Sequence, residues 1–247
     1  MVTLVAEVTK AAEPYDETLM NADAADGPRA PRRSPRRAGR PVAPLITAGS
    51  ITEAALGLLD DAGDFTMSQL ARRLGVGASA LYNHVAGKEE VLSRVRELVS
   101  DRIDTDVFGV SPFFDALLVW AHSYRDAFAR HPATIAVFAT TALDGAGRTT
   151  EMYERVVDAF LRAGWPEDDV MTTLVALEDF ILGAALDAVA PADMFQLRSP
   201  DDAPTLSRVT AASRRSVPGR RPAQASFEAG LEAMLTGLRV RLARLSS

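Results

Sequence analysis

The side chains best suited to chemistry lie between residues 66 and 88, in the stretch TMSQLARRLGVGASALYNHVAGK. It carries hydroxyl, amide, imidazole and ammonium groups, which hydrogen-bond to the phosphates and base edges of DNA. Leu81 and Val85 stand four residues apart, so they would form the buried side of a short helix and leave the small and polar residues around them facing outward. The pattern predicts a helix-turn-helix whose second helix enters the major groove.

Two short helices joined by a glycine turn would position these side chains. Thr66 and Gln69 have the T-x-x-Q spacing of a capping box, which predicts the start of the first helix. Leu70 and Leu74 lie on its apolar face, and Gly75 can end the helix because glycine adopts positive φ without strain.

Further helices are expected on both sides of the motif. One spans about residues 48–62 and ends at Gly63, and Thr47 and Ser50 are alternative caps for its first turn. Gly87 is expected to cap another helix, which would link the motif to the rest of the chain.

In the order and spacing of its residues, this region resembles the TetR family of bacterial transcriptional regulators. The resemblance covers about residues 45–104, with a weaker match at residues 227–238. It implies an all-α fold with a three-helix DNA-binding head and a helical body that binds an effector and forms a homodimer. In that dimer a long apolar helix and the last helix would pair with their counterparts as a four-helix bundle. The matching segments are residues 51–63, 66–75, 81–85 and 87–92.

The resemblance also assigns residues to the DNA interface. The front of the second motif helix corresponds to base contacts, and its end and the first motif helix correspond to phosphate contacts. Ala80 stands where the family commonly has threonine, so one hydroxyl contact is expected to be missing. Small residues in the base-facing positions leave specificity to Asn83, to methyl contacts and to DNA shape. The expected phosphate contacts are Thr66, Ser68, Tyr82, His84 and Lys88, and the expected base-facing residues are Gly77, Ala78, Ser79 and Asn83.

The charge is distributed as a DNA-binding segment requires. The whole chain has a net charge of -6, but residues 28–105 hold twelve basic and nine acidic groups and are net positive. Because phosphate contacts supply most sequence-independent affinity, the local charge matters more than the total.

Residues 1–44 show no sustained periodicity and are expected to be a disordered tail. One interpretation of its arginine- and proline-rich part is an arm that lies along phosphates or enters a minor groove. The alternative is a solvated tail without a role in binding. The arginines of this part are Arg29, Arg32, Arg33, Arg36, Arg37 and Arg40.

Deletion of residues 1–40 is expected to flatten the salt dependence of DNA affinity, because fewer phosphate charges would be neutralised. Affinity measured at several salt concentrations gives this slope. An unchanged slope would exclude the arm from DNA binding.

Beyond the linking helix the apolar periodicity predicts four or five helices and no strands. The proline-rich residues 191–222 have the composition of a loop. The expected organisation is therefore a tail over residues 1–44, a DNA-binding domain over 45–104 and a ligand-binding and dimerisation domain over 105–247. The expected later helices cover about residues 111–130, 131–141, 149–163, 168–190 and 227–245.

The body is expected to hold the effector, a small and largely apolar molecule. In TetR-like regulators the first helix after the linker borders the effector cavity, which points to His122; the alternative is a core or interface histidine. Aromatic residues at helical spacing could line a cavity or belong to the core. Asp179, on a mostly apolar helix, must be solvated, paired or facing a ligand. The expected effector contacts are Trp120, His122, Phe138, Trp165, Asp179 and Phe180.

Several other functions are not supported by the sequence. The chain has no cysteine, and its three histidines lack the spacing of a metal site, so we expect neither a metal nor another cofactor. The sequence shows no pairing of a nucleophile with a general base and no phosphate-binding loop, so it does not indicate an enzyme. Gly75-x-Gly77-x-x-Ala80 matches the spacing of a dinucleotide-binding motif, but it follows a predicted helix, whereas that motif follows a strand. The first residues lack the features of a signal peptide, so a cytoplasmic protein without a membrane partner is expected.

The expected function is a homodimeric repressor that a small-molecule effector releases from a palindromic DNA operator. The alternative is an effector-independent or activating regulator whose helical body has a filled core.

Overall fold

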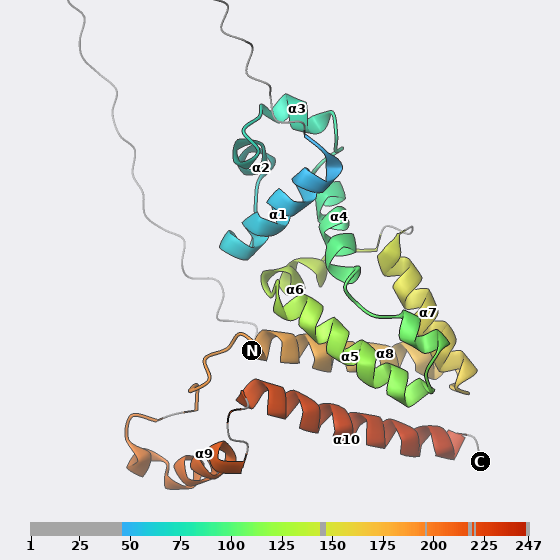
Figure 1. The fold of residues 1–247 in the computed structure, drawn as a ribbon, viewed down its shortest axis with the longest axis vertical. Coiled ribbons are helices and arrows are strands. Elements are labelled where there is room, and N and C mark those ends of the chain that lie inside the picture. Colours follow the sequence, from blue (N-terminus) through green and yellow to red (C-terminus); the bar gives the residue numbers. More distant parts are fainter. Residues whose placement is uncertain (1–45, 144–146, 196, 217–218, 220, 246–247) are drawn as a thin grey trace, which may run out of the picture. The chain divides into compact units, whose positions relative to one another are not determined.

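The computed structural model describes residues 46–143, 147–195, 197–216, 219 and 221–245 (Figure 1). Within these ranges the chain is helical and contains no strand, which confirms the expected all-α fold. The predicted tail and its arginine-rich arm lie outside the described residues. No described helix is both long and apolar enough to cross a membrane.

The first helix, α1 (Ala48–Ala62), has a well-defined cap at each end. Thr47 is the N-cap: its hydroxyl accepts a hydrogen bond from the Ser50 N–H at 3.1 Å, and the Ser50 hydroxyl accepts one from the Thr47 N–H at 3.0 Å. This reciprocal pair decides between the two predicted caps in favour of Thr47. Gly63 ends the helix at a φ of 75°, as predicted.

The helix-turn-helix consists of α2 (Met67–Arg73) and α3 (Ala78–Tyr82). Thr66 and Gln69 form the predicted capping box, and Gly75 has a φ of 70° in the turn between the helices. Leu81 and Val85 are buried as predicted, with 0% and 3% exposure, although Val85 lies beyond the end of α3. These two side chains fix α3 against the core and leave its other face free.

The remaining helices form the body and its connection to the head (Figure 1). Helix α4 contacts α1, α5 and α7, and α8 packs on α5, α7 and α10. The connecting helix therefore contacts elements of both the head and the body. These helices are α4 (Lys88–Ser100), α5 (Phe113–Ala129), α6 (Ala133–Phe138), α7 (Arg148–Arg162), α8 (Glu167–Asp187) and α10 (Pro222–Leu245).

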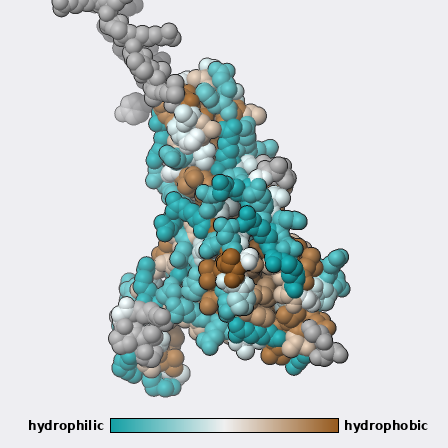
Figure 2. All heavy atoms as spheres, turned by 45° about the vertical axis from the view of Figure 1, so that its right-hand side comes forward, coloured by the Kyte–Doolittle hydropathy of each residue, from teal (hydrophilic) through white to brown (hydrophobic). Residues whose placement is uncertain are grey.

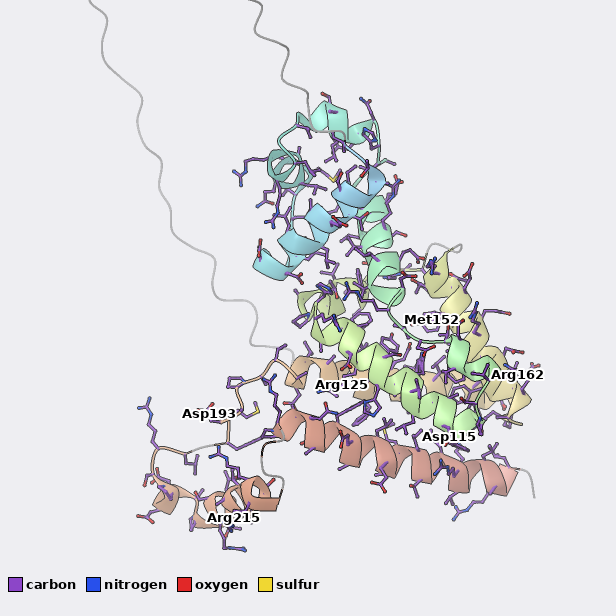
Figure 3. All side chains as sticks on the ribbon, in the orientation of Figure 1. Asp115, Arg125, Met152, Arg162, Asp193 and Arg215 are labelled. Carbon is purple, nitrogen blue, oxygen red and sulfur yellow. The ribbon has the colours of Figure 1, made fainter. Side chains whose placement is uncertain are left out.

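Helix α10 is fixed to α5 by a buried arginine. The Arg125 guanidinium donates to Gln224 Oε1 at 2.7 Å and lies 4.8 Å from the centre of the Phe227 ring, and Figure 3 labels it on α5. Arg125 is only 6% exposed, so these contacts take place within the core of the body. Gly230 lets α10 approach α8 closely, because a Cβ there would lie 2.7 Å from the Phe180 ring.

The prediction of a loop over residues 191–222 is wrong, because this region contains α9 (Pro204–Ser216) and a 3-10 turn at Pro200–Asp202. Pro204 and Pro222 are the first residues of α9 and α10. Proline is tolerated there because the first residues of a helix make no intrahelical N–H bond. The described part of the chain after residue 111 accordingly has six α-helices, where four or five were expected.

Candidate DNA interface and effector cavity

The predicted DNA contacts are distributed over α2, α3 and the turns beside them. All except Lys88 are exposed, and Ser68 and Ala78 line the same shallow depression, so the surfaces of α2 and α3 adjoin. Gly77 is the N-cap of α3 and Asn83 is its C-cap. Thr66, Ser68, Ala78, Ser79, Tyr82 and His84 complete the exposed set.

Helix α4 holds the turn that follows α3. Glu90 accepts a hydrogen bond from the Ala86 N–H at 2.6 Å and pairs with Arg94 at 2.5 Å. Arg94 in turn donates to the His84 carbonyl at 3.3 Å. The pKa of Glu90 is lowered, chiefly by the hydrogen bond from Ala86. The end of α3 is therefore tied to α4.

Lys88 differs from the other predicted contacts because it already has a partner. Its ammonium lies 2.5 Å from Asp64 and 5.2 Å from the centre of the Phe65 ring. The hydrogen bond from Lys88 is the main reason that the pKa of Asp64 is lowered. A DNA phosphate at Lys88 would have to compete with the Asp64 carboxylate.

Arg72 is a further candidate for a DNA contact that the sequence pattern did not indicate. It is exposed and lines the depression that Ser68 and Ala78 share, and its guanidinium has no partner among the described residues. The adjacent Arg73 instead pairs with Asp61 of α1 at 2.7 Å. Both arginines stand in the last turn of α2, so no sequence pattern separates the unpaired guanidinium from the paired one.

Arg72→Gln is expected to weaken DNA binding and to reduce the magnitude of the slope of log affinity against log salt by about 1 for each bound subunit, because each subunit loses one phosphate contact. Titrations at several salt concentrations test this, with Arg208→Gln on α9 as the control for loss of one charge. Equal slopes for the two variants would contradict a phosphate contact at Arg72.

The body contains a cavity of about 240 Å³ lined by residues of α4, α5, α6, α7 and α8. Phe138 is the one predicted effector contact among its lining residues, and Met152, labelled on α7 in Figure 3, is another part of the lining. Aromatic and aliphatic groups make up most of the wall. Its polar groups include Arg96, Ser100, Tyr124, Tyr153 and Glu178.

The other predicted effector residues do not line this cavity. Trp120 is fully buried in the core, and Trp165 packs against the buried Phe160 ring. His122 meets the Phe227 ring edge-on with centroids 5.0 Å apart, and Phe180 stacks on the same ring at 5.7 Å. Four of these side chains therefore serve packing, which is the common role of aromatic residues at helical spacing.

Asp179 is exposed, and the neighbouring Glu178 is the carboxylate that reaches the cavity. Glu178 is 9% exposed and accepts a hydrogen bond from the Tyr124 hydroxyl at 3.1 Å. Burial raises its pKa, against the opposing effect of hydrogen bonds from Tyr153 and Tyr124. Leu174, Glu178 and Ile181 lie on the buried face of α8. Because the opposite, exposed face also carries apolar residues such as Val175, the sequence pattern does not separate Glu178 from Asp179.

Glu178→Gln is expected to change how stability depends on pH. Because the pKa of Glu178 is raised above 4.5, the folded chain keeps a proton that the unfolded chain loses between 4.5 and that raised pKa. The wild-type protein therefore loses stability relative to the variant as pH rises through this window, and the difference then levels off. Urea unfolding from about pH 4 to 8 measures it, with exposed Glu154→Gln as the control. A constant difference would contradict the raised pKa.

Two residues of α4 bind the ends of α6 and α7 beside the cavity, and the first of them is Arg96. This guanidinium donates to the carbonyls of Ala142 at 3.0 Å, Phe138 at 3.2 Å and Thr141 at 2.5 Å. It also lies 5.1 Å from the centre of the Phe138 ring. A cation at the carboxyl end of α6 satisfies carbonyls that have no partner within the helix and complements the helix dipole.

Glu97, the next residue of α4, binds the amino end of α7. Its carboxylate accepts hydrogen bonds from the Thr149 hydroxyl at 2.6 Å, from the Thr149 N–H at 3.3 Å and from the Arg148 N–H. A Cβ at Gly147 would lie 2.7 Å from a Glu97 oxygen, so glycine there permits the approach. Two adjacent residues of α4 thus bind the end of α6 and the beginning of α7.

A family model for the tetracyclin repressor-like C-terminal domain matches residues 112–242, more than half of the chain. The chain belongs to the TetR family of transcriptional regulators. Members of this family bind DNA and small molecules and act as dimers. An HTH-type transcriptional regulator of Saccharopolyspora erythraea is 28% identical over 208 residues, which cover 79% of this chain and 85% of that protein.

Two further proteins extend the comparison. The HTH-type transcriptional repressor DrrR1 of Streptomyces coeruleorubidus is 26% identical over 235 residues, covering 85% of this TetR-family chain and 83% of DrrR1. The apo structure of ActR from Streptomyces coelicolor superposes with a TM-score of 0.62 at 22% identity, covering 81% of this chain and 97% of ActR. ActR has also been solved in complex with actinorhodin. At this identity the likeness to ActR shows the fold alone.

Proposed function

We propose that this TetR-family regulator is a homodimeric repressor that leaves a palindromic operator when a small molecule occupies the cavity between α4 and α8. The observation that carries the proposal is that Arg96 and Ser100 of α4 line this cavity, while the same helix holds the turn after α3. A ligand in the cavity would contact the helix that supports the DNA-reading element. The repressor DrrR1 and the ligand complex of ActR are consistent with this function.

In this proposal residues 45–104 form the DNA-binding domain and residues 105–247 the ligand-binding and dimerisation domain. Each α3 enters a major groove, and the two heads of a dimer reach successive grooves about 34–36 Å apart. Arg72 joins the predicted contacts at phosphates. The residues proposed for DNA are Thr66, Ser68, Arg72, Gly77, Ala78, Ser79, Tyr82, Asn83, His84 and Lys88.

The proposed dimer uses exposed apolar residues of α8 and α10. Met171, Val175 and Leu186 of α8 are 52%, 45% and 48% exposed, and Val240 of α10 is 49% exposed. Gly237 is exposed and a Cβ there would meet no atom within 4 Å, so a second helix could approach closely. Figure 2 shows exposed hydrophobic residues, in brown, among hydrophilic ones over the lower half of the face in view. Isologous pairing of such a surface would bury it in a closed dimer.

The effector would act by preferring one arrangement of the two heads. A ligand with equal affinity for the DNA-bound and DNA-free arrangements does not change the equilibrium between them, however tightly it binds. Displacement of α6 or α7 by a ligand would be passed to α4 through Arg96 and Glu97, which hold the ends of these helices. A different tilt of α4 would then change the spacing of the heads.

A selection of genome fragments with the purified full-length protein tests the proposal. We expect a palindromic site bound by one dimer, and loss of that complex when a ligand that raises the melting temperature of the protein is added. A site without two-fold symmetry would contradict the dimer. Stabilising ligands that leave the DNA complex intact would contradict effector release.

A further inference from the structure

We propose that the cavity selects an aromatic organic cation, with a ligand ammonium group placed on the carboxylate of Glu178. This inference rests on the proposed function of the cavity as the effector site and names the chemical class of the effector. It starts from a carboxylate that is nine-tenths buried and lines the cavity.

The Glu178 carboxylate has hydrogen-bond partners but no cation. Tyr124 donates to Oε1, and Tyr153 also hydrogen-bonds to the carboxylate. No lysine, arginine or histidine nitrogen of the described residues forms an ion pair with it. Two carboxylate oxygens offer about four acceptor positions, so the two tyrosines leave room for a further donor. Burial chiefly raises the pKa of Glu178, and the like charge of Asp179 adds to this effect.

Arg96 also lines the cavity, and three of its five N–H donors bind backbone carbonyls. Its two terminal nitrogens bind the carbonyls of Phe138, Thr141 and Ala142, and its central carbon lies 5.1 Å from the centre of the Phe138 ring. An anionic ligand could pair only with a guanidinium that already holds three carbonyls, and it would bring a second negative charge into the cavity that holds Glu178. A ligand ammonium placed at Glu178 would instead pair with a buried carboxylate that has no ion-pair partner among the described residues.

The remainder of the wall favours a flat apolar group. Phe128, Ile135, Phe138 and Leu182 contribute rings and aliphatic side chains. The volume of about 240 Å³ exceeds the roughly 150 Å³ of a cavity that accepts one benzene molecule. It is therefore large enough for one ring with a short arm. Aromatic faces also attract a cation electrostatically, which adds to the preference.

Three probes of similar size and different charge test the inference: phenethylamine, phenethyl alcohol and hydrocinnamate. Calorimetric titration of the full-length protein should give a Kd for the amine that is about tenfold or more below that of the alcohol, since charge-assisted hydrogen bonds are about twice as strong as neutral ones. Hydrocinnamate should bind more weakly than either. Equal affinities of amine and alcohol, or no binding of any probe up to about 10 mM, would overturn the inference.

Glu178→Gln identifies the group responsible for the preference. This variant keeps the size of the side chain and an acceptor for Tyr124, so the alcohol should bind with its wild-type Kd within about threefold, while the preference for the amine disappears. Glu154→Gln, the same change at an exposed residue of α7, should keep the preference. A preference that persists in Glu178→Gln would place the ammonium elsewhere and overturn the assignment.

The same samples separate this inference from the proposed function. An amine that binds through Glu178 but leaves the DNA complex intact would contradict effector release and leave the ligand class standing. Release of DNA by a neutral or anionic molecule, without any preference for the amine, would leave the repressor function standing and overturn the ligand class.

Discussion

Val175→Arg is expected to convert the dimer to monomers and to lower affinity for the palindromic operator by about 10²- to 10⁴-fold, the gain that a linked second head supplies. Val175 is 45% exposed on α8, in the surface proposed to pair with a second copy. Because a two-fold interface uses the same patch on both subunits, one substitution places two arginines in the contact. Their like charges would repel, and burying them without partners would be costly.

Sedimentation measures the state of association, and titration of a full and a half operator measures the loss of the second head. The variant should bind the half site as the wild type does. Leu161→Arg on α7 is a matched control, since Leu161 is 39% exposed but lies outside the proposed interface. A Val175→Arg protein that sediments as a dimer and binds the full operator normally would exclude this face of α8 from the interface.

The features that the sequence predicted well depend on neighbouring residues. The capping box at Thr66 and Gln69 and the αL residues at Gly63 and Gly75 are set by spacings of a few positions, so the residue types are sufficient to indicate them. The burial of Leu81 also followed from local periodicity. These features position α3, so the elements that carry the proposed DNA contacts could be predicted from the sequence.

The cavity could not be predicted in the same way, because its lining comes from five helices. Whether Glu178 or Asp179 faces inward depends on the rotation of α8 against α5 and α7, and one residue of sequence corresponds to about 100° around a helix. The free guanidinium of Arg72 likewise depends on Asp61 of α1, which pairs with Arg73 instead. Tertiary contacts decide such alternatives between adjacent residues of the same type.

Arg96→Met is expected to lower the free energy of unfolding by about 3 kcal/mol, since hydrogen bonds to a charged group contribute about 1.5–3 kcal/mol and the abandoned carbonyls would be left partly unsatisfied. Arg96 is 7% exposed, so solvent does not readily replace these bonds. Arg96→Lys should recover only part of the loss, because one ammonium cannot span the carbonyls of Phe138, Thr141 and Ala142 as the planar guanidinium does. Urea unfolding gives the free energies.

Loss of Arg96 should also separate ligand binding from DNA release, because the end of α6 would no longer be attached to α4. The expected variant binds DNA and the ligand, but ligand no longer lowers its DNA affinity. Arg155→Met is the control: its ion pair with Asp106 is exposed, so it should change stability by less than about 1 kcal/mol and leave release intact. Normal release by Arg96→Met would mean that the connection between cavity and head runs through Glu97 and α7 alone.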